Sequence, residues 1–137
     1  MENRVWKEAG ADRSARSDLS AHHHAMSMPI GDVVQELVSI LGATTVAVIG
    51  GVKETRAVQQ WCEGREPQRT HVLRFALQLA CMLTNQADRE FAVAWFHGSN
   101  PYVNDGVPML LLRTRPLAEI QAPLLRAARA FASESTA

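Results

Sequence analysis

The stretch GGVKETRAVQQWCEG, residues 50–64, contains the turn and the second helix of a predicted helix-turn-helix. Two helices that cross through a tight turn need a small residue at the crossing, and Ala47 is suited to that place. The turn itself needs a residue that tolerates positive φ, and Gly51 is one. Val52 is expected to fill the space between the two helices. These residues together predict the shape of the N-terminal part of the fold.

The second helix of this motif has an inward and an outward face. Val58 and Trp61 lie three residues apart, so both are expected to point inward, and Gly64 is suited to end the helix. Arg and Gln on the outward face are competent to read base edges in a DNA major groove. The predicted DNA-binding residues are Lys53, Thr55, Arg56, Gln59 and Gln60.

The charge pattern gives this DNA-binding prediction little support. Lys plus Arg number 14 and Asp plus Glu number 14, whereas phosphate neutralisation usually requires a basic excess. Between Thr44 and Arg74 five residues are basic and three are acidic. Lys53 occupies the expected capping position, where Ser or Thr is preferred, and Glu54 stands at the helix start. The alternative is that the motif only packs the N-terminal part of the fold.

Apolar residues recur at helical spacing through the rest of the chain, and no strand pattern competes with them. The predicted fold is therefore all-α, with an Xre-like helix-turn-helix lobe followed by a small helical domain. Prolines near the starts of the last two helices suit a first helical turn. The expected helices cover residues 30–41, 44–50, 53–61, 67–84, 88–97, 107–113 and 122–131.

Three segments are expected along the chain. Residues 1–28 carry few large apolar side chains and are predicted to form a mobile tail. Residues 29–66 form the helix-turn-helix lobe and residues 67–137 form the second helical domain. Three adjacent histidines, His22, His23 and His24, lie in the predicted tail without preorganised geometry. The sequence therefore predicts no metal site, and it contains no motif for a cofactor.

Cysteine use and hydropathy indicate a cytoplasmic protein. Cys62 and Cys81 have no paired ligand spacing and are expected to be reduced thiols. Arg74 interrupts the longest apolar run, so no membrane span is expected. The N-terminus has no apolar core of the kind that a signal peptide requires.

Residues 91–113, FAVAWFHGSNPYVNDGVPMLLLR, resemble part of a known antitoxin family, the Xre/MbcA/ParS class. Its members tend to have a Trp ending a helix, an Asn in the next turn and a Pro starting the next helix. Trp95, Asn100 and Pro108 match that pattern. The resemblance extends over about residues 32–131. One departure is that Pro101 follows Asn100, whereas the family commonly has Pro before the Asn.

The resemblance implies an antitoxin whose C-terminal domain covers the cofactor pocket of a RES-domain toxin, an enzyme that destroys NAD. Some members also repress their own operon through the helix-turn-helix, and a homodimer and a hetero-oligomer with the toxin are expected. Aromatic and Arg side chains are typical anchors of such an interface. The alternatives are the core for the aromatic residues and a solvated helix face for the arginines. The candidate toxin-binding residues are Trp95, Phe96, Asn100, Tyr102, Pro108, Arg113, Arg115, Arg126 and Arg129.

Two other functions compete with an antitoxin. His97, Ser99 and Asp105 contain the groups of a catalytic triad, but they lie in one short loop without a Gly-rich elbow or an oxyanion device. We therefore expect the protein not to be an enzyme. The second competitor is a stand-alone repressor that binds operator DNA through the Xre-like motif.

Overall fold

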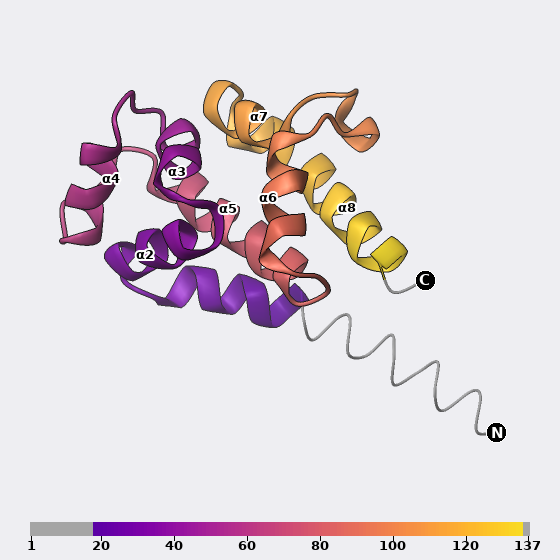
Figure 1. Ribbon diagram of the computed structural model, residues 1–137, viewed down its shortest axis with the longest axis horizontal. Coiled ribbons are helices and arrows are strands. Elements are labelled where there is room, and N and C mark those ends of the chain that lie inside the picture. Colours follow the sequence, from indigo (N-terminus) through magenta and orange to yellow (C-terminus); the bar gives the residue numbers. More distant parts are fainter. Residues whose placement is uncertain (1–17, 136–137) are drawn as a thin grey trace.

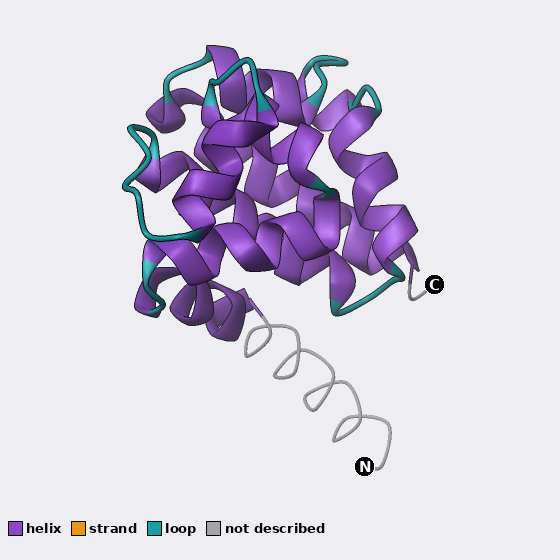
Figure 2. Cartoon of the chain, turned by 60° about the vertical axis from the view of Figure 1, so that its left-hand side comes forward, coloured by secondary structure: helices purple, strands orange, loops and turns teal. Residues whose placement is uncertain are grey.

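The computed structural model of the 137-residue chain describes residues 18–135. The regular secondary structure of these residues is all helical, as the sequence predicts (Figure 2). Their only strand-like feature is an isolated antiparallel bridge between Asn100 and Gly106. No helix in this part of the chain is both long enough and apolar enough to cross a membrane. After a helical segment at residues 18–27 come α2 (Ile30–Leu41), α3 (Ala43–Gly50), α4 (Thr55–Cys62), α5 (Thr70–Thr84), α6 (Arg89–His97), the 3-10 helix η1 (Pro101–Val103), α7 (Pro108–Thr114) and α8 (Leu117–Ser135).

Helix α5 is the centre of the molecule. It packs against α2 and α3 as well as α6 and α8 (Figure 1). Nearly all its side chains between Val72 and Leu83 are buried. This explains why its apolar residues occur around the whole helix rather than on one stripe. The buried side chains form one core that draws on both predicted domains. The boundary between residues 66 and 67 therefore does not separate two cores.

The turn between α3 and α4 depends on two adjacent glycines. Gly51 has φ 78°, and the N–H of Val52 donates to the carbonyl of Ala47 at 3.0 Å, which closes the end of α3. A Cβ added at Gly50 would lie only 2.6 Å from Cη2 of Trp61. Gly50 therefore lets the indole ring lie directly on the backbone of α3. The predicted small residue, Ala47, is buried as well.

Helix α4 ends as the sequence predicts but begins later. Val58 and Trp61 are buried, and Gly64, with φ 115°, follows the last turn. The prediction that Lys53 takes the capping position is wrong, because Glu54 is the N-cap and its side chain makes no capping hydrogen bond. Asp, Asn, Ser and Thr have side chains short enough to reach the first free N–H groups, and Glu is not among the preferred caps.

Two helix starts next to prolines also differ from the sequence prediction. Helix α5 begins at Thr70 rather than at Pro67, whose carbonyl accepts a hydrogen bond from the Thr70 hydroxyl. Helix α8 begins at Leu117, directly after Pro116, and contains Pro123 in its interior. The sequence predicted a start at residue 122, next to Pro123, but the helix begins one residue after Pro116. By contrast, Pro108 does lie in the first turn of α7, as predicted.

The prediction of a mobile tail is wrong for residues 18–28. Residues 18–27 are helical, and their Ala21 and Ala25 side chains are buried in the core. The guanidinium group of Arg74 donates to the carbonyls of Ala25 and Met28 at 3.0 and 2.7 Å. Small alanines and long-range hydrogen bonds hold this segment in place. The tail was predicted from the scarcity of large apolar side chains, and neither of these contacts requires one. Residues 1–17 of that prediction lie outside the described residues.

Candidate functional site

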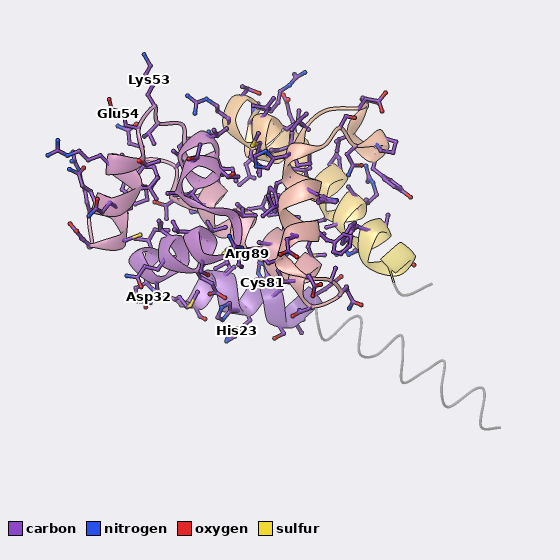
Figure 3. All side chains as sticks on the ribbon, viewed as in Figure 1. His23, Asp32, Lys53, Glu54, Cys81 and Arg89 are labelled. Carbon is purple, nitrogen blue, oxygen red and sulfur yellow. The ribbon has the colours of Figure 1, made fainter. Side chains whose placement is uncertain are left out.

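The outward surface of α4 contains most of the predicted DNA-binding residues. Lys53, Thr55, Arg56 and Gln59 are exposed, and Figure 3 shows Lys53 projecting from the turn before α4 with Glu54 beside it. Gln60 differs, because it is half-buried and its Oε1 accepts a hydrogen bond from Arg65 Nη1 at 2.8 Å. The structure thus leaves four of the five predicted residues free of the core.

The surplus of basic over acidic side chains that the sequence shows around α4 is not found on the surface of that helix. Arg69 and Arg74 supply the surplus of two between residues 44 and 74, yet both direct their guanidinium groups to main-chain carbonyls of other elements. Residues 53–66 then retain three basic and three acidic side chains. A phosphate backbone would meet no net positive charge here. The three bases are Lys53, Arg56 and Arg65, and the three acids are Glu54, Glu63 and Glu66.

A sharply bent turn, residues 98–107, joins α6 to α7. The side chain of Asn100 caps η1 by accepting a hydrogen bond from the N–H of Tyr102 at 3.0 Å, and Pro101 occupies the first position of η1. The Asn-then-Pro order, a departure from the family pattern, therefore produces a capped 3-10 turn. Asn104 and Asp105 both have positive φ, at 56° and 62°. Asn and Asp tolerate that conformation better than most residues.

Three of the predicted toxin-binding residues belong to the core instead. Phe96 is fully buried, Pro108 is buried and Trp95 is 7% exposed. Trp95 and Phe96 form an edge-to-face pair with ring centroids 5.1 Å apart. These three side chains fill the interior and form no part of the exposed surface. The indole N–H of Trp95 is buried without a hydrogen-bond acceptor in the described part of the chain.

Arg113 is also directed inward. Its Nη1 donates to the carbonyl of Val48 at 3.0 Å and to that of Val52 at 3.2 Å. Arg69, which the sequence analysis did not single out, donates to the carbonyls of Leu112 and Arg113 at 2.7 and 2.8 Å. The guanidinium group of Arg113 therefore contributes to the contact between α3 and α7. No periodic signal in the sequence marks such residues.

The remaining predicted residues lie at the surface of the C-terminal helices. Tyr102 is 51% exposed on η1, which packs against α8. Arg126 is exposed on α8, as is Arg129, whose Nε lies 2.8 Å from a carboxylate oxygen of Asp18. Arg115 is exposed and lies 4.0 Å from Glu119. An aromatic residue and several arginines thus remain accessible near the turn and along α8.

The histidine considered for a catalytic triad has a hydrogen-bond partner outside that group. The Nε2 atom of His97 lies 2.9 Å from the hydroxyl oxygen of Thr45, which is buried in α3. Ser99 and Asp105 are exposed in the turn that follows. The hydrogen bond to Thr45 gives His97 a role in joining α6 to α3.

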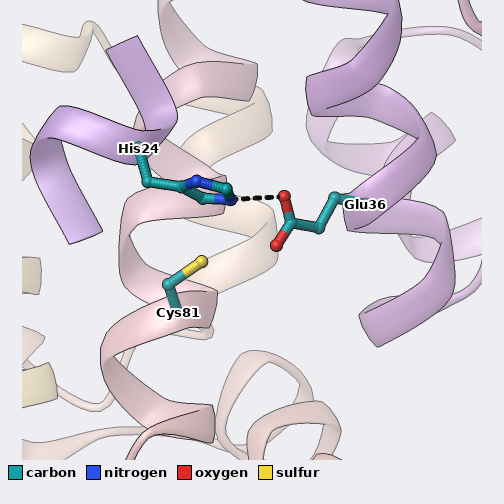
Figure 4. Close-up of side chains that lie close together, drawn as sticks. All are labelled: His24, Glu36 and Cys81. Carbon is teal, nitrogen blue, oxygen red and sulfur yellow. Dashed lines mark hydrogen bonds and ion pairs between the residues drawn. The ribbon is translucent and has the colours of Figure 1, made fainter. Parts of the chain in front are cut away.

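A cluster of metal-ligating side chains lies at the other end of the molecule. His24 of the N-terminal helical segment, Glu36 of α2 and Cys81 of α5 bring one ligand atom each to within 4.8 Å of one another (Figure 4). The Nε2 atom of His24 lies 2.6 Å from Oε2 of Glu36. The sequence analysis missed this cluster, because 57 positions separate His24 from Cys81 and only the fold brings them together.

Both thiols hold their protons more tightly than an exposed cysteine does. Burial raises the pKa of Cys81 from 9.0 to about 11, and the nearby carboxylate of Glu36 contributes to the increase. Burial also raises the pKa of Cys62, with a further contribution from Glu63. Neither cysteine takes part in a disulfide in the described part of the chain.

Comparison of the chain with protein-family models, with curated proteins and with solved structures finds no match.

Proposed function

We propose that this protein is the antitoxin of a type II toxin–antitoxin pair. In this proposal the C-terminal helices bind a RES-domain toxin that degrades NAD and cover its active site. The proposal rests on the resemblance around Trp95, Asn100 and Pro108, and a homodimer or a hetero-oligomer with the toxin would be the active assembly. Repression of its own operon would be a second activity of the same protein.

The observation that best supports this function is the surface formed by η1 and α8. Tyr102 is an exposed aromatic residue on η1, and Arg126 and Arg129 are exposed on the neighbouring α8. Tyr and Arg are enriched among the residues that contribute most to protein–protein binding. A guanidinium group is also suited to a pocket that normally holds the phosphates of a dinucleotide. We name Tyr102, Arg126 and Arg129 the C-terminal surface.

Co-expression with the protein encoded by the neighbouring reading frame tests the proposal, which requires that protein to be a RES-domain toxin. We expect the toxin alone to arrest growth, and co-expression to restore growth and to give a complex on size exclusion. Growth arrest that persists, with the two proteins eluting separately, would overturn the antitoxin assignment.

Variants of the C-terminal surface test where the toxin binds. Tyr102→Ala combined with Arg126→Glu should weaken binding at least about tenfold, because both side chains are accessible and of the types that anchor interfaces. Gln121→Ala, an exposed substitution on the same helix, is the matched control and should bind as the parent does. Equal binding by all of these proteins would place the interface elsewhere.

A stand-alone DNA-binding repressor is the second candidate. It is favoured by the exposure of Thr55, Arg56 and Gln59 on α4 and of Lys53 in the turn before it. Titration with the promoter at low salt should then show binding that falls steeply with salt and weakens on Arg56→Ala. Absence of binding, with and without toxin, would leave α3 and α4 as scaffold only.

A further inference from the structure

His24, Glu36 and Cys81 come from three separate elements and converge on one point. The helical segment 18–27, α2 and α5 each supply one of them, and their ligand atoms lie within 4.8 Å of one another (Figure 4). The three side chains provide a nitrogen, an oxygen and a sulfur ligand. This combination matches borderline-soft transition metals, whereas Mg²⁺ and Ca²⁺ prefer oxygen ligands alone.

From this convergence we propose that His24, Glu36 and Cys81 form a Zn²⁺ site that fastens the N-terminal helical segment to α2 and α5. Zn²⁺ takes imidazole nitrogen, carboxylate oxygen and thiolate sulfur in a tetrahedral arrangement, with the fourth position held by water in three-residue sites. The proposal concerns folding and assembly of this chain and is independent of any toxin.

The distances require only small side-chain movements. Metal–ligand bonds of roughly 2.0–2.3 Å place tetrahedral ligand atoms about 3.5 Å apart. The present atoms lie within 4.8 Å, so rotations of the side chains would close the site. His24 and Glu36 have side chains 44% and 33% exposed, which leaves them room to rotate and leaves an approach for the ion and its water.

Charge balance also favours a divalent cation at this point. Ligands bind a metal in their deprotonated forms, so in the bound state His24 would be neutral, Glu36 a carboxylate and Cys81 a thiolate. The resulting carboxylate and thiolate carry two negative charges, which one Zn²⁺ neutralises. Without the ion, the carboxylate of Glu36 disfavours the thiolate form of Cys81.

The first experiment is a Co²⁺ titration of the full 137-residue chain, without an affinity tag and with a phosphine reductant. Co²⁺ occupies zinc sites and gives a near-ultraviolet thiolate-to-metal absorption band when cysteine is a ligand. We expect a band at one equivalent that Zn²⁺ abolishes. Cys81→Ser should remove the band, and Cys62→Ser, the matched thiol control, should retain it.

Histidine variants separate this site from adventitious binding by the three adjacent histidines. His24→Ala and Glu36→Gln should each weaken Zn²⁺ binding at least about tenfold, as loss of a ligand does. His23→Ala, an exposed neighbour outside the cluster, should bind Zn²⁺ as the parent does. Circular dichroism of each variant without metal establishes that it is folded, and Glu36→Gln keeps the shape of the side chain.

Hydrogen exchange of residues 18–27 gives a readout of the proposed fastening. Zn²⁺ should slow amide exchange in this segment in the parent and in Cys62→Ser, and should have no effect in Cys81→Ser. Absence of the thiolate band in the folded parent chain would overturn the proposal. So would equal losses of affinity in His23→Ala and His24→Ala, because they would assign binding to the histidine run.

Discussion

The guanidinium group of Arg69 donates a hydrogen bond to the main-chain carbonyl of Arg113, with an Nη1–O distance of 2.8 Å. Arg113 in turn donates to the carbonyls of Val48 and Val52. The C-terminal ends of α3 and α7 meet at this point, where free carbonyls and two partial negative charges of the helix dipoles accumulate. The two positive side chains satisfy those carbonyls and offset the negative charge.

Arginine serves the same purpose at two further helix ends. Arg74 donates to the carbonyls of Ala25 and Met28, where the N-terminal helical segment ends. Arg89 Nε donates to the carbonyl of Ile40 in the last turn of α2 at 3.0 Å. Helices α2 and α3 have no basic residue in their own last turn. Arginine side chains from distant elements donate hydrogen bonds to the carbonyls at their C-terminal ends instead.

Removal of either central arginine should destabilise the fold. We expect Arg69→Ala and Arg113→Ala each to lower the free energy of unfolding by about 2–3 kcal/mol, because buried carbonyls lose charged donors. The double variant should lose less than the sum, since the two residues act on one group of carbonyls. Urea unfolding followed by circular dichroism measures these changes. Arg126→Ala on the exposed face of α8 is the control and should change stability by less than about 0.5 kcal/mol.

Gly50→Ala should be destabilising although alanine is the better helix former. Its Cβ would lie 2.6 Å from Cη2 and 2.7 Å from Cζ3 of Trp61, so the indole ring has to move. We expect a loss of about 1–3 kcal/mol in the free energy of unfolding, as in other overpacked cores. In a Trp61→Leu background the same substitution should be neutral or stabilising. Equal losses of unfolding free energy in both backgrounds would show that the Trp61 ring is not the reason why position 50 requires glycine.

The raised pKa of Cys81 makes stability depend on pH in the alkaline range. Between the ordinary pKa of 9.0 and the folded-state value of about 11, the folded chain keeps a proton that the unfolded chain releases. The contribution of Cys81 is therefore complete below pH 9.0 and is lost as the pH rises toward 11. The stability difference between the parent and Cys81→Ser, measured by urea unfolding, should shrink over that range. Cys62→Ser should show a change in the same direction, because burial also raises the pKa of Cys62. A difference between the parent and Cys81→Ser that is independent of pH would contradict the prediction.

Trp95→Phe should lower the free energy of unfolding less than replacement of a buried tryptophan usually does. The indole N–H of Trp95 is buried without an acceptor in the described residues, so its removal relieves a desolvated donor. That gain offsets much of the lost packing, and we expect a net change within about 1 kcal/mol. Thermal unfolding of Trp95→Phe and Trp61→Phe compares the two sites. A much larger loss at Trp95 would show that the N–H is satisfied in solution.

Local patterns in the sequence predicted the helical class, most helix positions and the turn around Gly51. They succeeded because apolar periodicity and the φ preference of glycine act within a few residues. They failed for residues 18–28, where two small alanines and Arg74 supply the contacts. The same limit affected the candidate interface. An aromatic residue or an Arg in the sequence fits a core, a helix end or an exposed surface. Trp95 lies in the core, Arg113 binds carbonyls at a helix end and Tyr102 is exposed.

By itself, the sequence determined the all-α fold, the tight turn at Gly51 and the inward placement of Val58 and Trp61, because hydrophobic spacing and backbone sterics are local properties. Only the tertiary structure decided which arginines donate hydrogen bonds to carbonyls at helix ends. It alone also brought His24, Glu36 and Cys81 together. Those contacts join residues tens of positions apart, and their energy depends on where packed helices place free carbonyls and ligand atoms, which no short stretch of sequence encodes.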